Sequence, residues 1–146
     1  MIEQLYLFAR IAGTRVAVRS NEIEAVVKLA DIAPVPAMPL HIAGLSALRS
    51  RVLTVIDVAA LIEGRVTPAE TGRLAIVADI AGHSYGFMVD SVSDICTTPD
   101  GELPLRGQLD PCWAAYARGI VEDGEGPSIL VTLGAFIEPR QLPVAA

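Results

Sequence analysis

Four aspartates lie in or beside apolar segments of this chain, where a carboxylate needs a hydrogen-bonding or charged partner or has a functional role. They are Asp57, Asp79, Asp90 and Asp94. General acid–base catalysis would need two such carboxylates a few ångströms apart and in different environments. An acidic residue beside a glycine or serine turn more commonly accepts hydrogen bonds from backbone N–H groups. We therefore interpret the four as residues of strand edges, turns and caps.

Histidine and serine offer a second kind of chemistry, because Asp79, His83 and Ser84 are the residue types of a catalytic triad. The three fall on one predicted hairpin turn, however, and no element for an oxyanion hole accompanies them. His41 follows a proline-rich segment and has no partner histidine. The glycines are scattered singly, so no phosphate-binding loop is indicated. The sequence thus predicts no enzyme, no metal and no cofactor.

Composition excludes further classes of function. The net charge is −6 and the basic residues form no cluster, which argues against nucleic-acid binding. The apolar run "VLTVIDVAALI" is interrupted by a charge and falls short of the ~18 residues of a membrane span, so we expect no membrane insertion. The N-terminus does not resemble a secretory signal, and Cys96 and Cys112 lack metal-site spacing. We therefore expect a cytoplasmic protein.

The elements that must position these residues are mostly β-strands, with Gly-containing turns in the pattern of β-hairpins. Two segments that follow strands, 58–62 and 133–137, are typical of short helical turns. The stretch 97–111 is rich in proline and glycine and predicts a loop. The predicted strands are residues 5–11, 15–19, 51–58, 74–80, 85–95 and 128–133.

A repeat relates the two halves of the chain. The stretch "RIAGTRVAV" at 10–18 aligns with "DIAGHSYGF" at 79–87, which places Gly13 on Gly82. Further along, Gly44 aligns with Gly119, and "VIDVAALI" at 55–62 aligns with "LVTLGAFI" at 130–137 in the same register. The second half is slightly longer between these two matches, and its additional residues fall in the predicted loop. We infer two homologous β units of roughly 60 to 70 residues each.

Units of that size bury too little apolar surface to be stable alone, so the two should pack around a shared core. Closure into small barrels would remove exposed strand edges. We predict a single domain, residues 1–146, with a first β unit at 10–72 and a second at 73–137. The pattern leaves open whether terminal strands are exchanged between the units.

The segment "GLSALRSRVLTVIDV" at 44–58 resembles the central signature of the CheW family of bacterial chemotaxis adaptors. That signature runs approximately G-hydrophobic-x-N-hydrophobic-R-G-x-x-x-P-V-x-D-L. The segment "GFMVDSVSDI" at 86–95 is similar to a second family signature, V-D-x-V-x-x-V. The opening hairpin and the closing strand also resemble the family, so four motifs follow in order over nearly the whole chain. The matching residues of the central signature are Gly44, Leu48, Arg49, Val55 and Asp57.

The resemblance implies a mostly β fold of two five-stranded, SH3-like barrel subdomains around a shared core, with short helical turns. It also implies a protein without catalytic activity or cofactor. Family members connect the regulatory domain of a CheA-type histidine kinase, which has the same fold, to the cytoplasmic tip of chemoreceptors. We therefore expect an adaptor that is recruited from the cytoplasm to receptor arrays at the membrane.

The resemblance further assigns kinase binding to Ile23, Val26 and Arg49. Ile23 takes the place of an exposed apolar contact residue, and Arg49 that of an arginine linked to both kinase and receptor coupling. For Ile23 the alternative is a core position, because the two faces of a strand cannot be told apart here. For Arg49 the alternative is a structural ion pair with Asp57 or Asp90.

Receptor binding is assigned by the same resemblance to Gly44, Leu45 and Arg49. Gly44 corresponds to a glycine beside the receptor-binding groove, and its alternative role is a strand bulge or close packing. Specificity of an interface resides in few residues, so departures from the family pattern affect binding before they affect the fold. The departures are Ala47 for asparagine, Ser50 for glycine, Thr54 for proline, and Ala25 where an acidic residue is common.

Two alternatives to this function stay open. The first is an adaptor of a non-flagellar chemosensory pathway, pilus-type or other. The second is a small β-barrel enzyme or ligand-binding domain that uses Asp57 or Asp90. A deep polar pocket around a carboxylate of raised pKa would favour the second alternative, and a shallow apolar groove would favour an adaptor.

Overall fold

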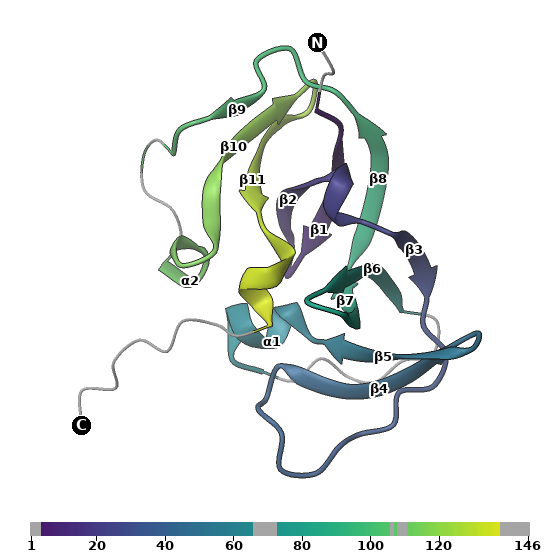
Figure 1. Ribbon diagram of the computed structural model, residues 1–146. Helices are drawn as coiled ribbons and strands as arrows, with labels where there is room; N and C mark the ends of the chain where they lie inside the picture. The colour runs from purple at the N-terminus through teal and green to yellow at the C-terminus, as the bar shows by residue number, and fades with distance from the viewer. Residues whose placement is uncertain (1–3, 66–72, 106, 108–110, 138–146) are drawn as a thin grey trace.

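The computed structural model describes residues 4–65, 73–105, 107 and 111–137, which fold into two β-sheets (Figure 1). The six-stranded sheet has the order β8-β1-β2-β11-β10-β9, and the five-stranded sheet has the order β3-β6-β7-β5-β4. The predicted mostly β fold is confirmed, with one strand more than expected in one sheet. The strands are β1 (Tyr6–Ile11), β2 (Thr14–Arg19), β3 (Ala25–Lys28), β4 (Ile42–Leu48), β5 (Arg51–Ile56), β6 (Leu74–Ile80), β7 (His83–Val89), β8 (Ser91–Cys96), β9 (Glu102–Leu103), β10 (Ala117–Asp123) and β11 (Gly126–Val131).

Two hairpins, β1–β2 and β6–β7, share one turn geometry. Ala12 and Gly13 have φ angles of 51° and 77°, and Ala81 and Gly82 have φ angles of 53° and 83°. Positive φ at both central residues is typical of the type I′ turn, whose twist matches that of the flanking strands. Both predicted hairpins are confirmed, and the aligned glycines occupy the same place in them.

The repeat extends to the pairing of the strands. β2 pairs in parallel with β11, where Val16 lies opposite Ile129. β7 pairs in parallel with β5, where Tyr85 lies opposite Thr54. The alignment that places Gly13 on Gly82 also places Val16 on Tyr85, and the one that joins the second pair of glycines places Thr54 on Ile129. The two sheets are therefore built on one plan.

The sheets do not follow the boundaries of the two sequence halves. β1 and β2 belong to the first half, yet they pair with β8 and β11 of the second half. Conversely, β6 and β7 pair with β3 and β5 of the first half. The predicted units 10–72 and 73–137 are thus repeats in the sequence, whereas each sheet combines strands of both. This interleaving joins two units that would each bury little surface.

The predicted strand 85–95 is divided in the structure. β7 ends at Val89 in one sheet, and β8 begins at Ser91 in the other. Between them, the Asp90 side chain accepts a hydrogen bond from the Gly13 N–H at 2.9 Å, and the Asp90 N–H donates to the carbonyl of Arg10 at 2.8 Å. These bonds hold the point where the chain crosses between sheets. The predicted loop 97–111 likewise contains a short strand, β9.

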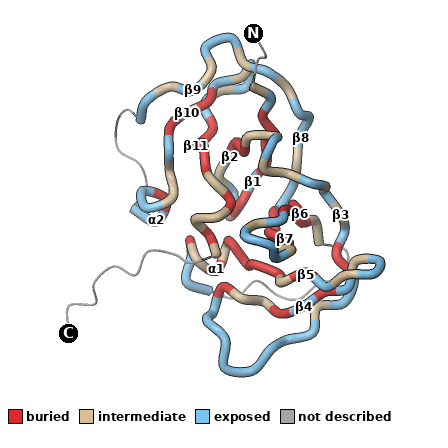
Figure 2. Tube along the Cα trace, viewed as in Figure 1, coloured by how far each residue is buried: buried red, intermediate tan, exposed pale blue. Residues whose placement is uncertain are grey.

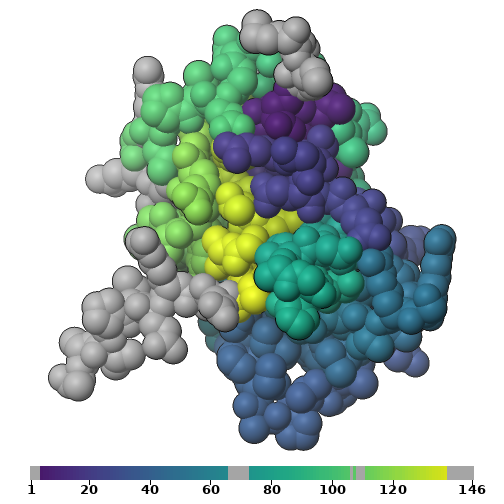
Figure 3. Space-filling view, in the orientation of Figure 1, coloured from purple at the N-terminus to yellow at the C-terminus, as the bar shows by residue number. Residues whose placement is uncertain are grey.

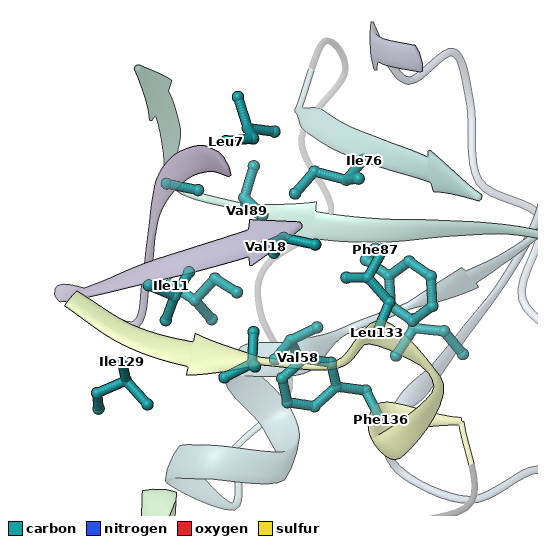
Figure 4. Close-up of a cluster of buried hydrophobic side chains, with 14 of the residues drawn as sticks. Leu7, Ile11, Val18, Val58, Ile76, Phe87, Val89, Ile129, Leu133 and Phe136 are labelled. Carbon is teal, nitrogen blue, oxygen red and sulfur yellow. The ribbon is translucent and has the colours of Figure 1, made fainter. Parts of the chain in front are cut away.

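The main apolar core lies between the two sheets (Figure 4), and buried residues follow the strands that face it (Figure 2). Two predicted helical turns are confirmed and close this core: the helix α1 (Val58–Glu63) and the 3₁₀ turn η2 (Leu133–Phe136). Short elements η1 (Ser20–Glu22) and α2 (Pro111–Ala114) complete the described chain. Each sheet also has a smaller apolar core on the face turned away from the main core. In the five-stranded sheet it is formed by Leu29, Leu53, Val55, Ala75, Val77 and Met88. In the six-stranded sheet it is formed by Tyr6, Phe8, Ala17, Val121 and Leu130.

Candidate functional site

Asp57 is the N-cap residue of α1. It is 1% exposed, and its Oδ1 accepts a hydrogen bond from the Ala60 N–H at 3.1 Å. Its own N–H donates to the carbonyl of the buried His41 at 2.7 Å, and the His41 Nε2 lies 3.0 Å from the carbonyl oxygen of Ile137. A side-chain cap of this kind stabilises a helix by about 1 kcal/mol. The signature aspartate therefore has a structural role.

The predicted ion pair of Arg49 with Asp57 or Asp90 is wrong. Arg49 lies in the β4–β5 turn, and Asp57 follows the opposite end of β5, about 20 Å away at 3.3 Å per residue. The charged neighbour of Asp90 is Arg73, at an N–O distance of 4.0 Å. Arg49 and Asp57 are close in the sequence, but β5 lies between them and holds them apart at its two ends.

Arg49 is exposed at the tip of the β4–β5 hairpin. Its φ of 55° lies in the left-handed region, which a two-residue turn between antiparallel strands requires. Within the part of the chain that the structure describes, no carboxylate forms a salt bridge with its guanidinium. The Arg49 guanidinium is therefore accessible at this turn.

A groove of about 370 Å³ opens between β3 and the β4–β5 turn. Figure 1 shows β3 and this turn at the same end of the five-stranded sheet, and Figure 3 shows the two segments side by side on the surface. The groove combines apolar walls with charged rims. It is lined by Glu24, Ala25, Val27, Leu48, Arg49, Ser50 and Arg51.

Arg51 of β5 connects the start of β3 and the end of β6 by ion pairs beside this groove. Its Nη2 lies 2.5 Å from Glu24 Oε1, and its Nη1 lies 3.5 Å from Asp79 Oδ1. The hydrogen bond to Glu24 raises the pKa of Arg51. Asp79 also accepts a hydrogen bond from the Ser84 hydroxyl at 2.7 Å, and the His83 ring packs edge-on against Tyr85. Asp79, His83 and Ser84, the residues with catalytic-triad side chains, thus make structural contacts at the β6–β7 hairpin.

The two apolar residues predicted to bind the kinase differ in exposure. Ile23 follows η1 and is half-buried against the main core, so its core alternative describes much of its side chain. Val26 is 37% exposed on β3, on the opposite face of the strand from Ala25 and Val27, which line the groove. Val26 is therefore the more accessible of the two side chains.

Gly44 lies where β4 comes unusually close to Ala33 of the β3–β4 connection. The β4–β5 register shifts between Ile42 and Gly44, and a Cβ at Gly44 would overlap the carbonyl oxygen of Ala33. Its φ of 146° adds a second reason for glycine. The bulge and close packing that the sequence analysis left open are therefore present. The neighbouring Leu45 is 39% exposed on the outer face of β4.

Other exposed features of the five-stranded half were not predicted from the sequence. Sequence analysis did not identify the Glu24–Arg51 pair, although opposite charges at two strand ends were a signal for it. It also missed exposed apolar side chains on β5 and on the β3–β4 connection, whose signal was the repeated proline–apolar pattern at 34–40. These side chains are Val35, Met38, Leu40 and Val52, each at least 37% exposed.

A second, larger hollow of about 700 Å³ lies on the six-stranded sheet, between β9 and the β10–β11 hairpin. Arg15 at its rim is engaged by Asp123 at 2.8 Å. Neither Asp57 nor Asp90 lines this hollow or the groove. In the described residues no three His, Cys, Asp or Glu side chains gather to hold a metal ion, and no described helix is long and apolar enough to cross a membrane.

Known proteins match this arrangement in sequence and in fold. The CheW-like domain family matches residues 5–138. A chemotaxis protein CheW of Rhizobium meliloti is 29% identical over 60% of this chain and 57% of its own length, so the match spans a little over half of that relative. A chemotaxis protein CheW of Thermotoga maritima is 26% identical over 81% of this chain and 77% of its own. The crystal structure of the scaffolding protein TtCheW from Thermoanaerobacter tengcongensis superposes with a TM-score of 0.79 at 19% identity, covering 96% of this chain and 91% of that one.

Proposed function

This chain belongs to the CheW family, and from that premise we propose that it is a non-catalytic chemosensory adaptor that couples chemoreceptors to a CheA-type histidine kinase. The observation that carries the proposal is the surface around the groove. Arg49 is presented there without a salt bridge to any described residue, and Ala25, Val27 and Leu48 supply apolar walls. Apolar and arginine side chains that meet at a concave site are typical of protein interfaces.

We assign the kinase to this groove surface, defined by Val26, Arg49 and the residues that line the groove. The half-buried Ile23 precedes β3 and packs against the main core. A regulatory domain of like fold would offer strand edges and turns of similar shape, as in the pairing of related subunits. This assignment predicts that Val26 and Arg49 contribute more to kinase affinity than Ile23 does.

We assign the receptor to the outer face of β4 and β5. Leu45 is exposed there opposite Thr54, which lies opposite Tyr85 in the next strand. Leu45 supplies the exposed apolar side chain of this face, which suits the apolar stripe of a receptor helix. Gly44 acts through the backbone geometry that places Leu45. Each contact is modest, and recruitment from the cytoplasm to a receptor array at the membrane would gain strength from many contacts at high effective concentration.

The alternatives differ in how the structure bears on them. A pilus-type or other non-flagellar pathway would use the same surfaces, so the geometry does not favour one pathway over the other. An enzyme based on Asp57 or Asp90 is disfavoured, because both carboxylates accept backbone hydrogen bonds at structural positions. Neither carboxylate lines the two hollows described above.

Co-sedimentation with receptor-bearing membranes tests the coupling. The cognate CheA-type kinase should sediment with these membranes when the chain is added and remain in the supernatant without it. Leu45→Asp should reduce sedimentation about tenfold, because it places a charge on the receptor face. The matched control is Leu5→Asp, since Leu5 is 43% exposed near the start of β1 in the other sheet. Equal effects of the two variants, or no kinase recruitment by the unaltered chain, would contradict the proposal.

A further inference from the structure

The groove holds two arginines in unequal electrostatic surroundings. Arg51 contacts Glu24 at 2.5 Å and Asp79 at 3.5 Å, so two carboxylates engage its guanidinium. Arg49 lines the same groove, yet no described residue supplies it with a salt-bridge partner. The left-handed backbone at Arg49 is costly for a residue with a side chain, and it holds the arginine at the mouth of the groove.

We propose that this groove receives an aspartate or glutamate side chain of the kinase, and that Arg49 holds its carboxylate by paired hydrogen bonds. The proposal rests on the adaptor function above and specifies its chemistry. A guanidinium presents a planar fork of donors that matches a carboxylate. A groove of about 370 Å³ has room for a side chain but not for a folded element.

Charge at the rims favours a carboxylate over a more highly charged group. Glu24 and Asp79 lie beside the groove, and they would repel a phosphate dianion more strongly than a single carboxylate. Val27 and Leu48 line the groove with Arg49 and offer the apolar contacts that exclude water from such a pair. The groove thus fits an acidic residue flanked by apolar residues.

Two substitutions at Arg49 measure the contact in the full-length chain with the full-length CheA-type kinase. Arg49→Gln should weaken binding about tenfold at low salt, which corresponds to about 1.4 kcal/mol. Arg49→Lys should weaken it less, because a lysine keeps the charge but loses the fork. Both losses should shrink at high salt, because salt screens the pair. Arg118→Gln, at an exposed position of β10 in the other sheet, makes the same change of net charge and should leave binding unchanged.

A competing carboxylate inside the chain tests the same pairing independently. Ala25 lines the groove with Arg49, so Ala25→Glu should occupy Arg49 and reduce kinase binding more than Ala25→Gln, which adds equal bulk without charge. Thermal unfolding establishes that each variant is folded, and the Arg49 pair decides the matter if the Ala25 pair does not fold. Equal affinities for Arg49→Gln and the unaltered chain, or for Ala25→Glu and Ala25→Gln, would overturn the carboxylate site while leaving the adaptor function standing. Absence of kinase binding by the unaltered chain would overturn both.

Discussion

Val26 of β3 and Ile95 of β8 occupy the same position on two different sheets. Val26 lies opposite Ile76, and Ile95 lies opposite Leu7. The alignment of the first two hairpins places Leu7 on Ile76, and the same register places Val26 on Ile95. Both exposed side chains are apolar, with exposed fractions of 37% and 51%. Because apolar exposure is shared by the two sheets, it does not by itself distinguish a binding surface from an edge strand.

The turns of the matching hairpins differ in charge. Arg49 occupies the β4–β5 turn of the five-stranded sheet, where Gly124 takes its place in the β10–β11 turn. Asp57 caps α1 through its side chain, whereas Thr132 precedes η2 without a side-chain cap. The barrel plan therefore forms without either charge. Asp57 is explained by the helix that it caps, and Arg49 is left as a charge that the repeated plan does not require.

The outer edges of the sheets differ as well. Ala33 bridges Leu45 by two backbone hydrogen bonds of 2.8 and 2.9 Å, and Leu103 of β9 pairs with Ile120 at the matching place. At the β9 edge Glu102 also accepts hydrogen bonds from Arg19 and from the Tyr6 hydroxyl, and we call these three residues the clasp. The Arg19 distances are 2.6 and 2.7 Å, and the Tyr6 distance is 3.0 Å. The insert in the second half is thus anchored by charge.

The largest losses of stability should come from substitution of the equivalent glycines Gly44 and Gly119, and the loss should be greater in the five-stranded sheet. Gly44→Ala should lower the free energy of unfolding by about 3 kcal/mol, since a Cβ would overlap a carbonyl oxygen at a positive φ. Gly119→Ala should cost about 2 kcal/mol, because its Cβ would lie 2.7 Å from the carbonyl oxygen of Leu103. Urea unfolding measures both. Gly124→Ala meets no atom within 4 Å and serves as the control, and a loss at Gly124 equal to that at Gly44 would reject the close-packing account.

Asp57→Ala should remove the cap that distinguishes α1 from η2. We expect the free energy of unfolding to fall by about 1 kcal/mol or more, since the Ala60 N–H loses its side-chain acceptor. Chemical denaturation measures this loss, and Thr132→Ala in the uncapped counterpart should cost less. A greater loss at Thr132 would contradict the assignment of Asp57 as a cap.

The clasp should make the β9 edge more sensitive to acid than the β4 edge. The hydrogen bond from Arg19 lowers the pKa of Glu102 below its usual value of about 4.5. Its contribution is therefore complete above about pH 4.5 and is lost as the pH falls through the lower pKa of the folded state. Amide exchange at Ile120 and Val121 should accelerate below pH 4.5 more than exchange at Leu45. Glu102→Gln should abolish this difference in pH dependence, and its persistence would show that another group is responsible.

The smallest effects should come from two serines at one rung of the paired hairpins. Ser46 of β4 lies opposite Leu53 of β5, and Ser128 of β11 lies opposite Val121 of β10. The two residue pairs are equivalent in the repeat, so the serine lies on the first strand of one hairpin and on the second strand of the other. Both hydroxyls are buried without a hydrogen-bond partner among the described residues. Ser46→Ala and Ser128→Ala should each raise the free energy of unfolding slightly, by about 0.5 kcal/mol, as thermal unfolding would show. A destabilisation by either would indicate that its hydroxyl is satisfied in solution.

Local patterns predicted the hairpins, the helical turns and the repeat, because turn glycines and apolar periodicity are properties of neighbouring residues. The interleaving of the halves was not predictable in the same way. A crossing at Asp90 depends on a hydrogen bond to Gly13, which is 77 residues distant in the chain. The sequence singled out Arg49 and left open an ion pair with Asp57 or Asp90. Proximity in the sequence suggested the pair with Asp57, but β5 separates the two residues because they lie at its opposite ends.

The different exposures of Ile23 and Val26 at the candidate site could not be predicted from the sequence, because they depend on tertiary packing. The alternation of β3 did not reveal which face meets the main core, so Ile23 and Val26 were equivalent in the sequence. Their exposure depends on η1, which turns the chain between β2 and β3, and on Ile76 of the paired strand. The Glu24–Arg51 pair similarly depends on closure of the five-stranded sheet between residues 27 positions apart.

The central claim is that the two sheets share a fold while only the five-stranded sheet binds the kinase, and one matched pair of variants tests it most directly. Titration calorimetry with the cognate CheA-type kinase should show that Val26→Asp weakens binding at least about tenfold, because it replaces an exposed apolar side chain of the β3 edge, which adjoins the groove, by a charge. Ile95→Asp, at the equivalent exposed position of the six-stranded sheet, should bind as the unaltered chain does. Equal losses for both variants, or a loss only for Ile95→Asp, would contradict the account.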